Sequence, residues 1–137
     1  MDALQFVPVR ILVVDDFAPW RRSVRSELKR HSELRLVAEV ADGLEAVQKA
    51  RELKPDLILL DIGLPSLNGI EAAKQIRQVV PNTKILFLTL NRDPDVVRAA
   101  LDTGAKGYVL KEDAGSELWP AIEMVLRSDQ FVSSRLI

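Results

Sequence analysis

The sequence predicts an α/β fold of the flavodoxin-like class, with a doubly wound parallel sheet of five strands and five helices. Two observations predict it. Five short stretches along the 137 residues have strand character, and each is followed by a segment whose apolar residues recur at helical spacing. Regular alternation of strand and helix implies parallel strands, right-handed crossovers and helices on both faces of the sheet.

The predicted strands differ in how apolar they are. Three are continuous apolar runs, at residues 11–14, 57–60 and 85–88, which are typical of strands buried on both faces. Residues 34–40 alternate apolar and polar side chains, as a half-exposed edge strand does. With a short fifth strand at 107–110, the order 2-1-3-4-5 places the alternating strand at an edge and the apolar runs inside.

Capping signals mark the starts of two predicted helices. Asp42 with Glu45, and Asn68 with Glu71, have the spacing of a capping box. The last helix is expected over roughly 115–127. These signals separate the helices from the strands that precede them, as the predicted fold requires.

Length and composition indicate one domain, residues 1–128, followed by a C-terminal tail or the start of a linker at 129–137. Apolar residues make up 47% and charged residues 28%, a mixture typical of globular proteins. With a net charge of -1, the chain has no excess of basic residues of the kind that binds nucleic acid. The absence of cysteine excludes disulfides and thiolate metal sites. No signal peptide or membrane-length apolar run is present, so we expect a cytoplasmic protein without membrane contact.

Acidic residues follow two predicted strands that are neighbours in the sheet. Asp15 and Asp16 follow the first strand, and Asp61 follows the third. The carboxyl ends of these strands meet at the switch point of the sheet, where such folds bind ligands. Two carboxylates about 4 Å apart repel by roughly 4 kcal/mol at an effective dielectric near 20, so a bound cation is expected. Oxygen ligands without sulfur favour Mg²⁺.

Two further polar residues follow the remaining strands. Thr89 offers a hydroxyl after the fourth strand, and Lys111 offers an ammonium after the fifth. Together with Asp61 as nucleophile they predict a phosphoryl-accepting site. Each residue alone has a simpler explanation, as a turn acid, a strand-end residue or a solvated charge. Their joint occurrence at strand ends, in the order of the fold, favours the site.

The chain resembles the response-regulator receiver domain of two-component signalling over about residues 9–128. The resemblance rests on the Asp15-Asp16 pair, the turn 61–65 with Asn68-Gly69 behind it, Thr89, Tyr108 and Lys111. It implies that Asp61 accepts a phosphoryl group from a histidine kinase or phosphotransfer protein. It also implies a Mg²⁺ site in which Asp16 binds directly, Asp15 binds mainly through water, and Asp61 and the Gly63 carbonyl complete the ligands.

The resemblance also implies how the signal is passed on. Thr89 and Lys111 would contact the phosphoryl group, and Thr89 and Tyr108 would be the switch residues, with Tyr108 turning inward on activation. Residues 104–108 and 131–136 look like the subfamily with a C-terminal LuxR-type helix-turn-helix output. DNA binding and transcription regulation would then require an output domain absent from this chain. A weak homodimer is expected through helix 4, strand 5 and helix 5, or through helices 1 and 5.

Two positions depart from the family pattern, and two other functions compete with the switch. Leu90 replaces a usually small residue, and either covers the mouth of the site or packs on the fourth helix. Glu112 stands where a cis proline is common, so we expect a trans bond after Lys111.

A phosphohydrolase resembling the haloacid-dehalogenase family needs an acid where Gly63 stands, so no enzyme is expected. A degenerate receiver that only binds partners ranks lower, because all the acids are present.

Overall fold

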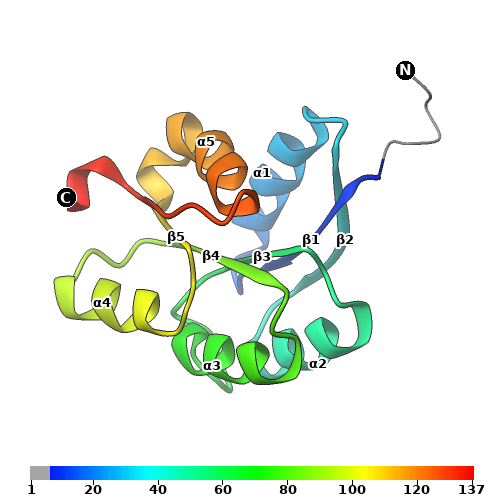
Figure 1. The fold of residues 1–137 in the computed structure, drawn as a ribbon, viewed down its shortest axis with the longest axis horizontal. Coiled ribbons are helices and arrows are strands. Elements are labelled where there is room, and N and C mark those ends of the chain that lie inside the picture. The colour runs from blue at the N-terminus through cyan, green and yellow to red at the C-terminus, as the bar shows by residue number, and fades with distance from the viewer. Residues whose placement is uncertain (1–6) are drawn as a thin grey trace.

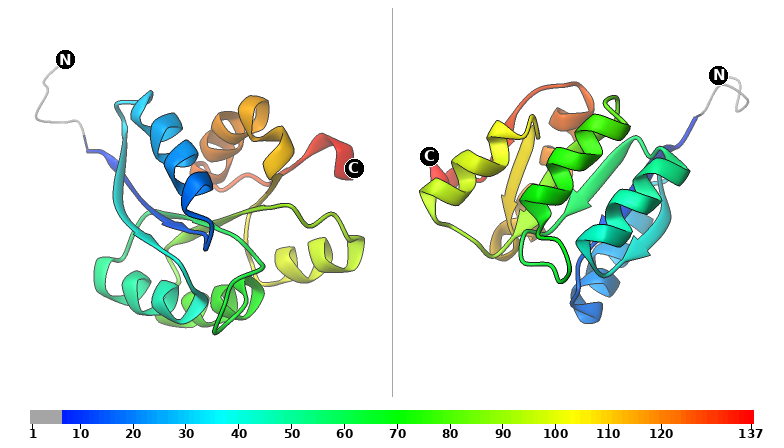
Figure 2. Two further views of the ribbon diagram at one scale, coloured as in Figure 1. Left: turned by 180° about the vertical axis from the view of Figure 1, so that it is seen from behind. Right: turned by 90° about the horizontal axis from the view of Figure 1, so that it is seen from below.

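A computed structural model of the chain describes residues 7–137 and confirms the predicted flavodoxin-like architecture (Figure 1). A parallel sheet lies between two helical layers, with α1 and α5 on one face and α2, α3 and α4 on the other (Figure 2). The five main strands are β1 (Val9–Val14), β2 (Leu34–Val40), β3 (Leu57–Leu60), β4 (Lys84–Thr89) and β5 (Gly107–Leu110). The helices are α1 (Ala18–Lys29), α2 (Gly43–Leu53), α3 (Gly69–Val79), α4 (Pro94–Asp102) and α5 (Ala114–Leu126).

The sheet has the predicted order with one strand added, β2-β1-β3-β4-β5-β6. The apolar runs in β1, β3 and β4 are buried, because helices cover both faces of these central strands. The amide of Asp15 donates to Val40 O (3.1 Å), and the amide of Asp61 donates to Val14 O (3.0 Å). The parallel pairing therefore continues just beyond the strands and holds both acids at the same edge of the sheet.

The predicted capping residues begin their helices. The side chain of Asp42 accepts a hydrogen bond from the amide of Glu45 (2.8 Å), and Asn68 accepts one from Glu71 (3.0 Å). Each bond satisfies an amide that has no partner inside its helix. The loops after β2 and β3 are thereby held in place.

A bulge interrupts β2 at the edge of the sheet. The pairing register shifts between Ile11 and Leu12 of β1, which leaves Val37 without a partner. One extra residue reverses the alternation of side chains, so the simple alternation expected from the sequence is broken. The apolar side chains of β2 consequently serve both cores, Leu34 and Leu36 under α1 and α5, and Ala38 and Val40 on the other face.

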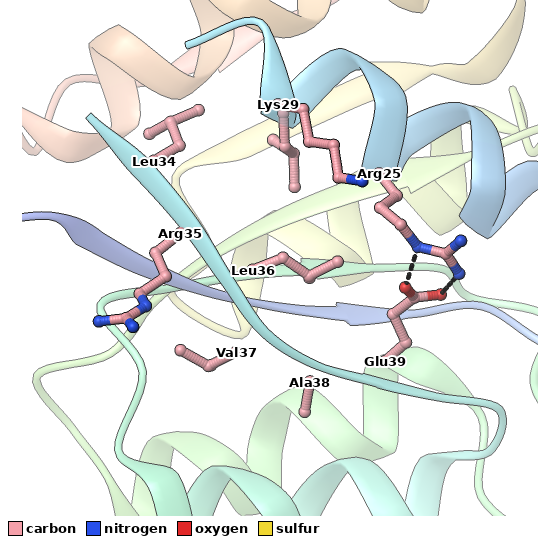
Figure 3. A pocket seen from close by; sticks show the side chains of 9 residues that line it. Arg25, Lys29, Leu34, Arg35, Leu36, Val37, Ala38 and Glu39 are labelled. Atoms are coloured by element: carbon pink, nitrogen blue, oxygen red, sulfur yellow. Dashed lines mark hydrogen bonds and ion pairs between the residues drawn. The ribbon is translucent and has the colours of Figure 1, made fainter. Parts of the chain in front are cut away.

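A groove of about 540 Å³ lies along this edge between α1 and β2 (Figure 3). Arg25 and Lys29 of α1 line it together with β2 from Leu34 to Glu39. Charged side chains and a bulge at a sheet edge discourage pairing with another chain. None of the acids at the strand ends lines this groove. We therefore interpret it as protection of the sheet edge.

The opposite edge of the sheet is covered by a C-terminal strap, residues 131–136, that the sequence analysis did not anticipate. It comprises the short strand β6 (Phe131–Val132), Ser133 and the 3₁₀ turn η3 (Ser134–Leu136). β6 pairs in parallel with β5, and the amide of Ser133 donates to Tyr108 O (2.9 Å). The segment expected to be a tail or linker therefore packs along β5 (Figure 1).

Side chains fasten the strap to α5 and to the turn before it. Ser133 is fully buried, accepts from the amide of Leu110 (2.9 Å) and donates to Glu117 (2.6 Å). Arg135 makes two hydrogen bonds, both 2.7 Å, to the carboxylate of Asp113 in the 3₁₀ turn η2 (Lys111–Asp113). The strap thus contacts the residues on both sides of Lys111.

Replacing Ser133 by alanine should destabilise the protein by about 1–3 kcal/mol, because the buried amide of Leu110 loses its acceptor. Ser134→Ala is the matched control, since Ser134 Oγ also donates to Glu117 (3.0 Å) but lies in an exposed position. Urea unfolding measures both variants. Equal free energies of unfolding for the two would contradict the assignment of Ser133 as the anchor of the strap.

Candidate functional site

The predicted acids and the predicted lysine come together at the carboxyl end of the sheet. Carboxylate oxygens of Asp15, Asp16 and Asp61 all lie within 4.8 Å of one another. The ammonium of Lys111 lies 2.7 Å from Asp15 Oδ2 and 3.0 Å from Asp61 Oδ2. Residues from the ends of β1, β3 and β5 therefore form one charged cluster, as the strand order predicts.

Lys111 is charged in this cluster. Burial by itself lowers the pKa of the ammonium, but hydrogen bonds and charge interactions with Asp15 and Asp61 outweigh burial, so the pKa is raised. The side chain of Lys111 is only 11% exposed. A largely buried, positively charged group thus faces the two buried carboxylates.

Backbone amides hold the same two carboxylates from the other side. Asp15 Oδ1 accepts from the amide of Phe17 (2.9 Å), and Asp61 Oδ1 accepts from the amide of Ile62 (2.7 Å). Each acid therefore has one oxygen on a backbone amide and the other on Lys111. Asp16, by contrast, is exposed, so its carboxylate remains accessible.

The turn after Asp61 needs glycine at position 69. A Cβ on Gly69 would lie 1.9 Å from the carbonyl oxygen of Asp61, which is far inside contact distance. The amide of Gly69 also donates to Ile62 O (2.8 Å). Gly63 lies in this turn two residues after Asp61, and the ligand role of its carbonyl stays a prediction.

The two predicted switch residues meet at Asn91, which the sequence analysis missed. Thr89 is buried, and its Oγ1 accepts from the amide of Asn91 (3.3 Å). Tyr108 points inward, is fully buried and donates to Asn91 O (2.6 Å). Burial, followed by the charges of Asp61 and Asp93, raises the pKa of Tyr108, which keeps the phenol a neutral donor. The contact depends on the path of the β4–α4 loop and has no local sequence signal.

The two positions that depart from the family pattern lie on loops at the site. Leu90 is 66% exposed, so it is not buried against α4. Glu112 forms an ion pair with Arg92 (3.0 Å), which joins the loop after β4 to the turn after β5. Every peptide bond among residues 7–137 is trans, which confirms the expectation for Lys111–Glu112.

An ion-pair network supports the loop that carries Asp15. Arg21 donates to the carbonyl oxygen of Asp15 (2.6 Å), and its Nε lies 3.4 Å from Glu39. Arg25 binds the same carboxylate through two hydrogen bonds of 2.6 and 3.0 Å (Figure 3). Glu39 can face α1 because the bulge at Val37 reverses the side-chain alternation. Sequence reasoning missed this network, since pure alternation does not bring Glu39 to α1.

Comparison with known proteins gives the family. The model of the "Response regulator receiver domain" matches residues 11–123, which is most of the chain. Together with the sheet order and the cluster of acids and lysine, the match shows that the chain belongs to the response regulator receiver domain family. In the described part of the chain, no helix has the length and apolar character needed to cross a bilayer.

Relatives with sequence similarity are regulators. Response regulator protein VraR of Staphylococcus saprophyticus is 34% identical over 131 residues, covering 96% of this chain and 63% of the relative. Transcriptional regulatory protein DegU of Brevibacillus brevis is 34% identical over 128 residues, covering 93% of this chain and 54% of the relative. The chain thus spans 54–63% of the length of these two relatives.

A solved structure supports the same family. A two-component response regulator of the LuxR family from Aurantimonas sp. SI85-9A1 matches with a TM-score of 0.90 and 35% identity. The match covers 95% of this chain and 93% of that chain. The similarity therefore extends over the sheet, both helical layers and the strand ends that carry the acids.

The Glu39 network predicts a pH-dependent contribution to stability. Hydrogen bonds from Arg25 lower the pKa of Glu39 against the opposing effect of burial. The stabilisation is therefore fully present above pH 4.5, the ordinary pKa, and is lost as the pH falls through the lowered value. Glu39→Gln should be less stable than wild type at pH 7, and the difference should shrink below pH 4.5.

Chemical unfolding between about pH 3 and about pH 8 measures the free energy of unfolding of both proteins. This range extends about one pH unit or more to each side of an ordinary glutamate pKa. Glu52→Gln is the control, because Glu52 is exposed and contacts Gln48 and Lys49 of its own helix. A stability difference for Glu39→Gln that stays constant down to the lowest pH would show that the charge of Glu39 is not involved.

Proposed function

We propose that this chain is a phosphorylatable receiver in which Asp61 accepts a phosphoryl group from a histidine kinase or a phosphotransfer protein. One observation carries the proposal. The Asp61 carboxylate lies at the switch point of the sheet, with the Lys111 ammonium 3.0 Å away and oxygens of Asp15 and Asp16 within 4.8 Å. A nucleophile, a fixed cation and further oxygen ligands are what phosphoryl transfer to a carboxylate requires.

The proposed reaction moves one phosphoryl group between two side chains. An oxygen of Asp61 forms a bond to phosphorus while the bond from phosphorus to the donor's histidine nitrogen breaks, and the electron pair of that bond returns to the nitrogen. Lys111 then neutralises a phosphoryl oxygen, and Thr89 donates its hydroxyl to another. Rearrangement of Thr89 would reach Tyr108 through Asn91, since both side chains contact that residue.

The carboxylate cluster fits Mg²⁺ because its donors are all oxygens and lie close together. Bound Mg²⁺ supplies positive charge to the phosphoryl oxygens. In the proposal Asp16 and Asp61 bind it directly, the Gly63 carbonyl completes the protein ligands, and Asp15 acts mainly through water. The exposure of Asp16 supports its direct role, since its carboxylate is accessible to a hydrated ion.

The output of the proposed switch is transcription regulation by a longer protein. The relatives VraR and DegU are a response regulator and a transcriptional regulatory protein, and this chain spans only part of their length. DNA contact would then be made by a helix-turn-helix domain outside this chain, in the cytoplasm. A catalytic phosphohydrolase is disfavoured, because Gly63 supplies no general acid beside Asp61.

Of the two surfaces predicted for a weak homodimer, we propose α1 and α5 rather than the face of α4, β5 and α5. The C-terminal strap pairs with β5 and packs beside α4, so this chain itself covers the outer edge of β5. On the other side of the sheet, His31 just after α1 stacks on Trp119 of α5 with ring centroids 3.8 Å apart, and both residues are half-buried.

Asp61→Asn should abolish labelling by a phosphodonor in the presence of Mg²⁺, because the amide is not a nucleophile for phosphorus. Phosphate-affinity electrophoresis or intact-protein mass spectrometry measures the label. Asp56→Asn is the control, since Asp56 precedes β3 at the opposite end of the same strand. Undiminished labelling of Asp61→Asn would refute the proposed function.

Leu90→Ala should accelerate both phosphorylation by small donors and hydrolysis of the aspartyl phosphate, by up to about a hundredfold. Both reactions need in-line approach to Asp61, and we propose that the exposed side chain of Leu90, which directly follows Thr89, restricts that approach. The free energy of unfolding should change by no more than about 0.5 kcal/mol, as at other exposed positions.

Leu44→Ala is the matched control for this variant, because Leu44 is also an exposed leucine, at 57%, but lies on α2. Both rates are measured by following the label after donor addition and after donor removal. Wild-type rates in folded Leu90→Ala protein would mean that Leu90 does not restrict access to Asp61.

A further inference from the structure

Trp20 lies in the first turn of α1, two residues after the helix begins at Ala18. Pro19 precedes it and presets the backbone of that turn. The indole is half-buried and packs against the core under α1 and α5. Its ring also faces the charged cluster, because the Lys111 ammonium lies over the ring at 5.3 Å from its centroid.

Three groups surround the ammonium of Lys111: two carboxylates and the indole ring of Trp20. The ammonium bonds to Asp15 at 2.7 Å and to Asp61 at 3.0 Å, so carboxylates hold it from the β1 and β3 side. A lysine stem has four flexible bonds, and two carboxylate contacts fix the charged end without fixing the stem. An aromatic face within about 6 Å attracts the cation and restricts the stem.

We propose that Trp20 is a positioning residue for phosphoryl transfer to Asp61, acting through Lys111. The indole face holds the ammonium beside Asp61, where it meets the incoming phosphoryl oxygens. This inference rests on the proposed function and assigns a role to a residue outside the cluster of acids, threonine and lysine. The ring of Trp20 acts on the site through the ammonium that lies over it, so Trp20 is not itself a catalytic residue in this proposal.

A structural role alone makes different predictions. Trp20 packs in a core, so any truncation removes apolar contacts and lowers stability. Packing responds to the size of the replacement side chain, whereas the contact with Lys111 responds to the aromatic face. Phenylalanine keeps a face with a weaker attraction for a cation, and leucine keeps apolar bulk without a face.

The first experiment compares labelling rates of Trp20→Leu, Trp20→Phe and Trp119→Phe with wild type, all with Mg²⁺ and acetyl phosphate. Trp20→Leu should be slower by about threefold to thirtyfold, the range expected for loss of one partly desolvated cation–π contact. Trp20→Phe should be labelled faster than Trp20→Leu but more slowly than wild type. Trp119→Phe should be labelled at the wild-type rate. Equal rates for leucine and phenylalanine, whether slow or normal, would overturn the proposal.

A second measurement keeps the test independent of phosphorylation and of folding losses in Trp20→Leu. The sequence has two tryptophans, so Trp119→Phe leaves Trp20 as the sole tryptophan emitter. Adding Lys111→Met to this variant should change the emission of Trp20, because the charge over its ring is removed. Identical spectra would overturn the contact itself. If Asp61→Asn is still labelled while the spectra differ, the proposed function fails and the contact stands.

Discussion

The site depends on the placement of one positive charge among three negative ones. Lys111 bonds to Asp15 and Asp61, which are both buried, while Asp16 remains exposed. Two carboxylates about 4 Å apart repel by roughly 4 kcal/mol at an effective dielectric near 20, so this crowding needs a cation within contact distance. The ammonium holds Asp15 and Asp61 together in the fold, and it lies against the carboxylate of Asp61, the proposed phosphoryl acceptor.

The strand ends and the loops around them hold the charged residues in place. Parallel pairing of β1 with β3 aligns Asp15 and Asp61, and Gly69 lets the following turn pass against the Asp61 carbonyl. On the other side, Arg21 binds the Asp15 carbonyl and is itself paired with Glu39. A bulge in an edge strand therefore has an effect at the functional site, because it turns Glu39 toward α1.

The C-terminal strap connects the site to the end of the described chain. It accepts a hydrogen bond from Leu110 and binds Asp113, which lie one residue before and two residues after Lys111. Tyr108, the buried residue predicted to be part of the switch, also donates its hydroxyl to the β4–α4 loop and accepts from the strap through its carbonyl. Strand β5 thus joins the acid cluster, through Lys111 at its end, to Tyr108 and the strap.

The sequence by itself determined the α/β class, the order of the five main strands, the capped helix starts and the meeting of Asp15, Asp16, Asp61 and Lys111 at one edge of the sheet. Periodicity and strand-end position are local properties, so a single chain displays them. Only the tertiary structure decided the bulge at Val37, the convergence of Thr89 and Tyr108 on Asn91, and the pairing of residues 131–132 with β5. These contacts join segments that carry no complementary local pattern, since their geometry follows from how the packed sheet and loops place them.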